Sequence, residues 1–177
     1  MYKNELRSTI KEKTYTLNKE YKQTASDIIT DKIISSDEFK NSGIIFIFIS
    51  TDSEPDTKKI IQTAWEQEKI VCVPKCFEKG KMKAFKLNCF DELTKGKYGI
   101  PEPEAKNEIT VNDIDLAIVP CLSASADGRR LGHGGGYYDR FLQNCKCKKI
   151  CLCFKALTCQ NIPMDEFDIY MDKVITD

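Results

Sequence analysis

Four short, uninterrupted apolar segments recur along this 177-residue chain and limit its fold more than any other feature. These segments are IIFIFIS at 44–50, IVCVP at 70–74, LAIVP at 116–120 and KICLCF at 149–154. Apolar runs of this length, rich in β-branched and aromatic residues, are typical of strands that are buried on both faces. Such strands need helices on each side of their sheet, so the pattern predicts an α/β protein with a mostly parallel sheet.

The segments between the strands have helical periodicity where a crossover helix is needed. Apolar residues at helical spacing predict two helices within 3–40, with a break at 16–18, and another helix over 56–68. A helix is also expected from Tyr137 to about Cys145. The strand at 44–50, the helix at 56–68 and the strand at 70–74 therefore predict a β-α-β unit with parallel strands.

The remaining segments complete the expected sheet. Residues 79–93 are more polar, and MKAFKL within them alternates as an edge or hairpin strand does, whereas KYGIPEPEA at 97–105 reads as a loop. KVIT near the end predicts a last short strand. We expect residues 1–177 to form one domain, an open, mostly parallel sheet with helices on both faces.

Charge and cysteine content exclude several classes of function. The 27 basic residues balance the 27 acidic ones, which predicts neither a nucleic-acid partner nor a membrane partner. The first residues are too charged for a signal peptide and the longest apolar run is too short to cross a bilayer, so we expect a cytoplasmic protein. The nine cysteines are expected to be free thiols. The pairs Cys145/Cys147 and Cys151/Cys153 have C-x-C spacing, which favours a packing role as small apolar side chains over a zinc site, because zinc ligands usually have C-x₂₋₄-C spacing.

The segment RRLGHGGGYYDR at 129–140 is the strongest candidate for chemistry. It follows a predicted strand and leads into a predicted helix, where an open α/β sheet binds its ligands. Four glycines within five residues let a phosphate approach the backbone amides, and the arginines add positive charge. Asp139 offers a hard oxygen ligand for Mg²⁺. The alternative interpretation is a mobile surface turn, since no Gly-Lys-Ser/Thr closes the loop as in a P-loop.

The letters HGGG at 133–136 also match the oxyanion-hole motif of lipase-like hydrolases. That class requires a Gly-x-Ser-x-Gly elbow and a separate catalytic histidine. The chain has no serine in that setting, and His133 is its single histidine. The same count excludes metal sites that are built on several histidines.

Five ordered motifs together resemble the 5-formyltetrahydrofolate cyclo-ligase family, also called the methenyltetrahydrofolate synthetases. The motifs are Lys3-x-x-x-Arg7, Glu54-Pro55-Asp56-Thr57, Tyr98-Gly99-Ile100-Pro101-Glu102-Pro103, RLGHGGGYYDRFL at 130–142, and Pro163 to Asp168 followed by Asp172-x-Val174. The resemblance covers the whole chain and implies a single-domain, Rossmann-like α/β fold related to the sugar-phosphate isomerase and CoA-transferase group. It also implies ATP-dependent closure of 5-formyltetrahydrofolate, with or without a polyglutamate tail, to 5,10-methenyltetrahydrofolate.

The resemblance assigns a role to each matching residue. It implies that Arg130 and Lys3 are catalytic residues and that Asp139 and Asp168 are ligands of Mg²⁺. The ATP-binding residues that it implies are Lys3, Arg7, Arg130, Leu131, Gly132, His133, Gly134, Gly135, Gly136, Tyr137 and Tyr138. The implied substrate-binding residues are Ile49, Glu54, Tyr98, His133, Gly134, Gly135, Gly136 and Tyr137.

Three positions depart from the family pattern. Many relatives have tryptophan or phenylalanine near Tyr98, and some have lysine at Gly135. Phe167 stands where histidine often precedes the aspartate that matches Asp168. The first change keeps an aromatic face, whereas the last one removes a polar neighbour of the expected metal ligand.

Other interpretations of these residues remain open at the level of sequence. Lys3 and Arg7 could also lie on a solvated face of a helix, and Glu54 could stabilise the start of a helix as a capping acid. Tyr98 could simply cover the core, and Asp168 could lie in a solvated loop. The whole chain also fits a nucleotide-binding domain without catalysis, or an isomerase or transferase on the related fold. We expect the protein to be a monomer.

Overall fold

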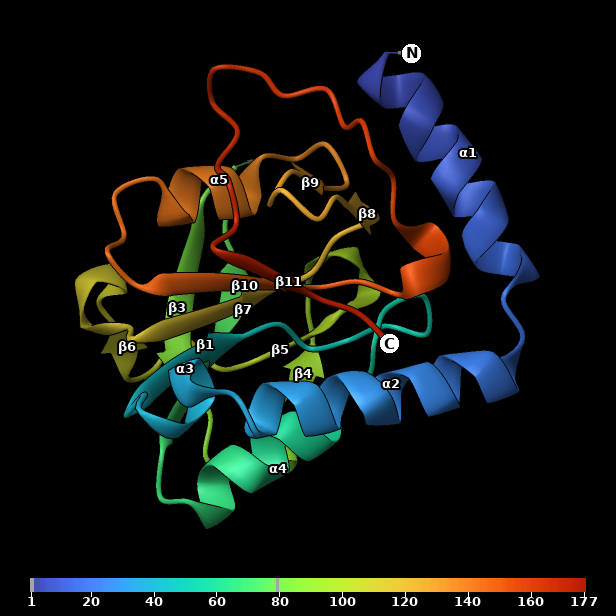
Figure 1. Ribbon diagram of the computed structural model, residues 1–177. Helices are drawn as coiled ribbons and strands as arrows, with labels where there is room; N and C mark the ends of the chain where they lie inside the picture. Colours follow the sequence, from blue (N-terminus) through green and yellow to red (C-terminus); the bar gives the residue numbers. More distant parts are fainter. Residues whose placement is uncertain (1, 79) are drawn as a thin grey trace.

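A seven-stranded sheet forms the centre of the protein in a computed structural model that describes residues 2–78 and 80–177 (Figure 1). Its strand order is β11-β10-β7-β1-β2-β3-β6. The sheet strands are β1 (Ile44–Ile47), β2 (Ile70–Cys76), β3 (Met82–Lys86), β6 (Glu108–Ile109), β7 (Leu116–Val119), β10 (Lys148–Leu152) and β11 (Lys173–Ile175). Every pairing among β11, β10, β7, β1 and β2 is parallel, whereas β3 is antiparallel to both β2 and β6. The prediction of an open, mostly parallel sheet is confirmed.

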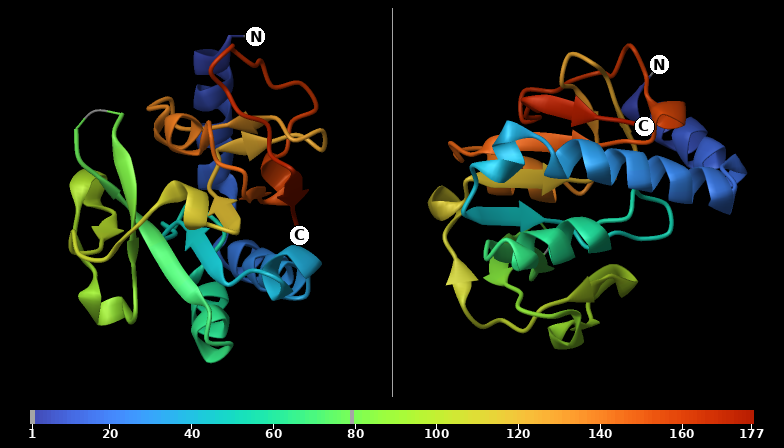
Figure 2. Two further views of the ribbon diagram at one scale, coloured as in Figure 1. Left: turned by 90° about the vertical axis from the view of Figure 1, so that its left-hand side faces the viewer. Right: turned by 60° about the horizontal axis from the view of Figure 1, so that its bottom comes forward.

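Helices cover both faces of this sheet (Figure 1). The α-helices are α1 (Lys3–Thr16), α2 (Lys19–Ile34), α3 (Asp37–Lys40), α4 (Lys58–Glu66) and α5 (Tyr137–Leu142). Short 3₁₀ turns lie at Phe90–Glu92, Lys97–Gly99, Val111–Asp113 and Lys155–Leu157. Helices α2 and α4 lie on one face and α5 lies on the other, while α1 stands at the end toward which the parallel strands run (Figure 2). Helix α5 is shorter than predicted, because Cys145 N–H donates to the Leu142 carbonyl and tightens the last turn.

The core follows from the alternation of side chains along β1. Phe46 is fully buried, and its ring lies 4.9 Å from that of Phe141 and 6.2 Å from that of Tyr138, both on α5. Ile45 and Ile47 point to the opposite face, because successive side chains of a strand alternate. That face is covered by α2 and α4, so β1 is central, as its apolar sequence predicts.

Two short hairpins lie outside the main sheet. One pairs β4 (Thr94–Lys95) with β5 (Pro101–Glu102); β5 lies within the segment 97–105 that was expected to be a loop, and β4 lies just before it. The other pairs β8 (Ser123–Ala124) with β9 (Arg130–Leu131) and carries the start of the glycine-rich segment. The predicted hairpin strand in 79–93 is β3, although Lys79 itself lies outside the described residues.

In the turn of the β8–β9 hairpin, we expect a substitution at Gly128 to lower the stability of the protein strongly. Gly128 has φ +89°, and a Cβ atom there would lie 2.4 Å from the backbone oxygen of Met171. Gly128→Ala is therefore expected to lower the free energy of unfolding by about 2 to 4 kcal/mol, through left-handed strain and overpacking together. Urea unfolding measures this loss.

Gly99→Ala is the matched control for that substitution. Gly99 has φ +75°, but nothing lies within 4 Å of its added Cβ, so only the backbone strain of about 1 to 2 kcal/mol remains. Equal losses for the two variants would show that the contact with Met171 does not matter.

Candidate active site

The strand order reverses between β1 and β7, which is where an open α/β sheet forms a crevice for ligands. From β1 the chain continues to β2 on one side, and β7 later returns to the other side of β1. A cavity of about 620 Å³ lies at the carboxyl ends of these strands. Phe48 and Ile49 line it just after β1, and Pro120 lines it just after β7.

Every residue to which the sequence assigned a role lines this one cavity. The set comes from α1, from the loop after β1, from the 3₁₀ turn before β5, from the glycine-rich segment and from the loop before β11. The residues are Lys3, Arg7, Ile49, Glu54, Tyr98, Arg130, Leu131, Gly132, His133, Gly134, Gly135, Gly136, Tyr137, Tyr138, Asp139 and Asp168.

The glycine-rich segment is held in place by two arginine side chains, Arg7 of α1 and Arg140 of α5. Gly134 and Gly136 have φ values of +97° and +64°, which glycine adopts without steric cost. Arg7 Nε donates to the Gly132 carbonyl over 3.0 Å, and Arg140 donates to the carbonyls of Gly135 and Gly80. The backbone of this segment is therefore fixed before any ligand binds.

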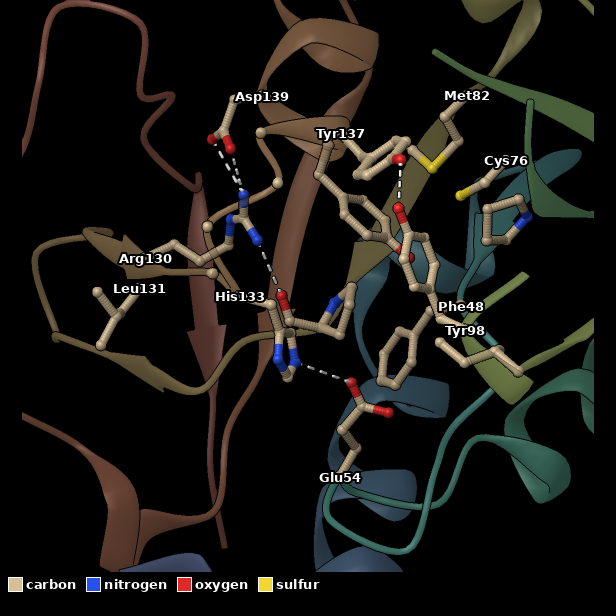
Figure 3. A pocket seen from close by; sticks show the side chains of 18 of the residues that line it. Phe48, Glu54, Cys76, Met82, Tyr98, Arg130, Leu131, His133, Tyr137 and Asp139 are labelled. Atoms are coloured by element: carbon tan, nitrogen blue, oxygen red, sulfur yellow. Dashed lines mark hydrogen bonds and ion pairs between the residues drawn. The ribbon is translucent and has the colours of Figure 1, made fainter. Parts of the chain in front are cut away.

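Arg130 is buried behind this segment and is paired with Asp139 (Figure 3). Its Nη2 donates to both carboxylate oxygens of Asp139, at 3.0 and 2.8 Å, and its Nη1 donates to the Pro120 carbonyl. Burial lowers the pKa of Arg130, but the charge of Asp139, its hydrogen bonds with Arg130 and other nearby groups together raise it, so the guanidinium stays charged. The pair fixes the Asp139 carboxylate at the wall of the cavity.

Lys3 makes a second ion-paired group at the same wall. Its ammonium donates to Asp165 over 2.6 Å and also to Asp168, which joins α1 to the loop before β11. Burial lowers the pKa of Lys3, but the hydrogen bonds to the two aspartates raise it overall. Both expected metal ligands, Asp139 and Asp168, are thus each paired with one basic side chain.

The opposite wall carries Glu54 and Tyr98, and both meet the glycine-rich segment (Figure 3). Glu54 Oε1 lies 3.8 Å from His133 Nε2, and the Glu54 side chain is 9% exposed. The Tyr98 hydroxyl lies 2.8 Å from that of Tyr137. Tyr98 also has φ +63°, an uncommon conformation for a residue other than glycine that points to a functional constraint.

Comparison with known proteins identifies this arrangement. The family model of the 5-formyltetrahydrofolate cyclo-ligases matches residues 1–177. The chain belongs to this family.

Similar proteins agree with that membership over nearly the full length. The chain is 33% identical to the 5-formyltetrahydrofolate cyclo-ligase of Mus musculus, over 98% of this chain and 92% of the relative. It is 28% identical to that of Escherichia coli, over 94% and 96%. A solved structure of the 5,10-methenyltetrahydrofolate synthetase of Aquifex aeolicus superposes with a TM-score of 0.87 at 28% identity, covering 99% of this chain and 89% of the other. The expected family and fold are confirmed.

The cavity of this cyclo-ligase also contains residues that sequence reasoning missed. They are Phe48, Thr51, Pro74, Cys76, Met82, Ile100, Glu102, Pro120 and Asp165. Pro74 and Pro120 could have been found, because each ends an apolar strand whose carboxyl end was expected to face the ligand. Thr51 and Asp165 carry no such signal, since a lone polar residue in a loop has many ordinary explanations.

Metal clusters, membrane-spanning helices and the packing of the cysteines complete the description of the protein. Among the described residues, no group of three or more histidine, cysteine, aspartate or glutamate side chains is placed to hold a metal ion. Over the same part of the chain, no helix combines the length and apolar character needed to span a membrane. Cys151 and Cys153 are buried in and just after β10, as expected for cysteines that pack in the core.

Proposed function

We propose that this cyclo-ligase binds ATP and 5-formyltetrahydrofolate together in the cavity at the carboxyl ends of β1 and β7. The reaction is the ATP-dependent conversion of 5-formyltetrahydrofolate to 5,10-methenyltetrahydrofolate, with release of ADP and phosphate. One observation carries the proposal: the expected pterin-binding residues and the expected phosphate-binding segment face each other in a single cavity. Across this cavity, Glu54 Oε1 lies 3.8 Å from His133 Nε2 and the Tyr98 hydroxyl lies 2.8 Å from that of Tyr137.

The chemistry explains why both ligands must lie side by side. The formyl group is an amide, so its carbon is a poor electrophile and its oxygen a poor leaving group. Transfer of the γ-phosphoryl group of ATP to that oxygen makes an iminium-like phosphate ester. The neighbouring aryl amine then forms the new C–N bond, and the C–O bond breaks as phosphate leaves.

The protein contributes mainly position and charge to such a transfer. Backbone amides of 132–136 are proposed to contact the phosphates, with Lys3 and Arg7 supplying positive charge from α1. Arg130 is proposed to act in catalysis by neutralising charge and by holding Asp139, which it contacts through two hydrogen bonds. Ile49, Glu54 and Tyr98 are proposed to hold the pterin, with Glu54 accepting hydrogen bonds from its N–H groups.

The cavity wall also fits Mg²⁺. Mg²⁺ is usually held by one or two carboxylates together with the phosphates of a nucleotide, and Asp139 and Asp168 supply two carboxylates beside the glycine-rich segment. When bound, the ion would offset the negative charge of the phosphates. Arg130 and Lys3 form ion pairs with these two carboxylates, which keeps both side chains in place.

An absorbance assay tests the proposed function. Purified protein is mixed with 5-formyltetrahydrofolate and Mg-ATP, and the near-ultraviolet absorbance of the methenyl product is followed. We expect product only when ATP is present. Lack of product would favour a nucleotide-binding domain without catalysis, and turnover without ATP would favour an isomerase or transferase.

Tyr98 provides a prediction about the substrate side of the cavity. Tyr98→Ala is expected to raise KM for 5-formyltetrahydrofolate about tenfold through lost stacking, and to leave KM for ATP within about twofold. Tyr98→Phe keeps the ring and removes the hydroxyl contact with Tyr137, so it should stay close to the wild type. Steady-state kinetics with each substrate varied in turn measures both, and equal effects of Ala and Phe would contradict a stacking role.

We also propose an oligomeric state, a cellular compartment and a form of the substrate for this enzyme. A monomer remains the expected oligomeric state, and buried free thiols such as Cys72 and Cys121 support a reducing compartment such as the cytosol. Tyr98 is 66% exposed, so the side of the cavity that is proposed for the pterin is open to solvent. Polyglutamylated substrate is therefore expected to bind as well.

A further inference from the structure

Thr51 lies in the loop between β1 and α4 and lines the cavity, although no sequence motif marks it. It stands three residues before Glu54, whose carboxylate is the proposed partner of the pterin. Thr51 donates two separate hydrogen bonds to the Glu54 carboxylate.

The two donors meet the same oxygen of Glu54. Thr51 N–H and Thr51 Oγ1 each donate to Glu54 Oε2 over 2.8 Å. In return, Glu54 N–H donates to the Thr51 carbonyl over 3.0 Å. Oε2 is thus fully engaged by Thr51, while Oε1 is directed toward His133 on the opposite wall.

The rest of the loop gives Thr51 a fixed position. Thr57 Oγ1 donates to the Phe48 carbonyl over 2.9 Å, and Ser50 N–H donates to Thr57 Oγ1 over 3.2 Å. These bonds tie the end of β1 to the start of α4. A glutamate held at one oxygen by such a loop loses little further conformational freedom when a ligand binds its other oxygen.

We propose that Thr51 is a positioning residue that turns Oε1 of Glu54 toward the amino and imino N–H groups of the pterin. This inference rests on the proposed role of Glu54. The backbone bond from Glu54 N–H to the Thr51 carbonyl already closes the 51–54 turn, so the hydroxyl donor on Oε2 is not needed for the turn itself. Its effect is to fix the orientation of the carboxylate, so that the oxygen not bound by Thr51 faces the substrate.

Thr51→Val tests the inference, because valine keeps the shape and the backbone N–H but removes the hydroxyl. We expect KM for 5-formyltetrahydrofolate to rise about tenfold, while KM for ATP and kcat stay within about twofold. Thr51→Ser keeps the hydroxyl and is expected to restore a value near the wild type. Asp52→Ala is the matched control, since Asp52 is an exposed residue of the same turn and is not among the residues that line the cavity.

Glu54→Gln separates failure of this inference from failure of the role of Glu54. If Glu54→Gln raises KM for the folate and Thr51→Val does not, the inference is overturned while the role of Glu54 stands. If neither variant changes that KM, the role of Glu54 is wrong and the inference falls with it. If Thr51→Val raises KM for both the folate and ATP and also lowers Tm, the role of Thr51 is purely structural and the inference is overturned. If the valine variant does not fold, Thr51→Ala repeats the test.

Discussion

Replacing Arg130 with alanine is expected to reduce turnover at least a hundredfold and to destabilise the fold. The guanidinium is buried and holds Asp139 through two hydrogen bonds, so its loss leaves a partly buried carboxylate without its cation. Breaking a buried ion pair from one side typically costs about 3 to 5 kcal/mol of stability. Loss of one positioned charge near a transferring phosphoryl group costs about 3 to 4 kcal/mol of transition-state stabilisation, which is more than a hundredfold in rate.

The rate of single-turnover ATP cleavage in the presence of the folate measures the loss of catalysis in Arg130→Ala. Urea unfolding measures the loss of stability. Arg129→Ala is the control, because Arg129 pairs with Asp127 beside the same hairpin and is not among the residues that line the cavity. Near-normal single-turnover cleavage by a folded Arg130→Ala protein would contradict a catalytic role for Arg130.

Asp139→Asn is expected to reduce turnover by a similar factor, for a different reason. Asparagine has nearly the same shape but removes the charge that both Arg130 and the proposed Mg²⁺ require. Turnover should therefore fall a hundredfold or more, and the Mg²⁺ concentration that gives half-maximal rate should rise. Titration of the rate with Mg²⁺ at saturating ATP measures the second effect.

Two comparisons make the Asp139 prediction specific. Asp168→Asn leaves the Arg130–Asp139 pair intact, so it should raise the Mg²⁺ requirement with a smaller loss of stability. The double variant Arg130→Ala/Asp139→Asn should be less destabilised than the sum of the two single variants, because the two residues contact each other. An unchanged Mg²⁺ requirement in Asp139→Asn would remove this residue from the proposed metal site.

The sequence predicted the fold well where a pattern is local. The apolar runs at 44–50 and 116–120 became adjacent parallel strands, and the periodic segment at 56–68 became the crossover helix α4. The β4–β5 hairpin was missed, since strands of two residues are too short to have a period. The site set was predicted from ordered motifs and lies around one cavity, but the role of each residue there remains a proposal.

By itself the sequence determined which segments are buried, where they turn, and that a glycine-rich segment follows a strand end. Only the tertiary structure decided that Arg130 pairs with Asp139, that Lys3 reaches Asp168, and that Thr51 fixes one oxygen of Glu54. The physical reason is that periodicity reflects burial of a residue's own segment, whereas a hydrogen bond depends on where packing places two side chains. Lys3 and Asp168 are 165 residues apart in the chain, and only the docking of α1 beside the last loop brings them into contact.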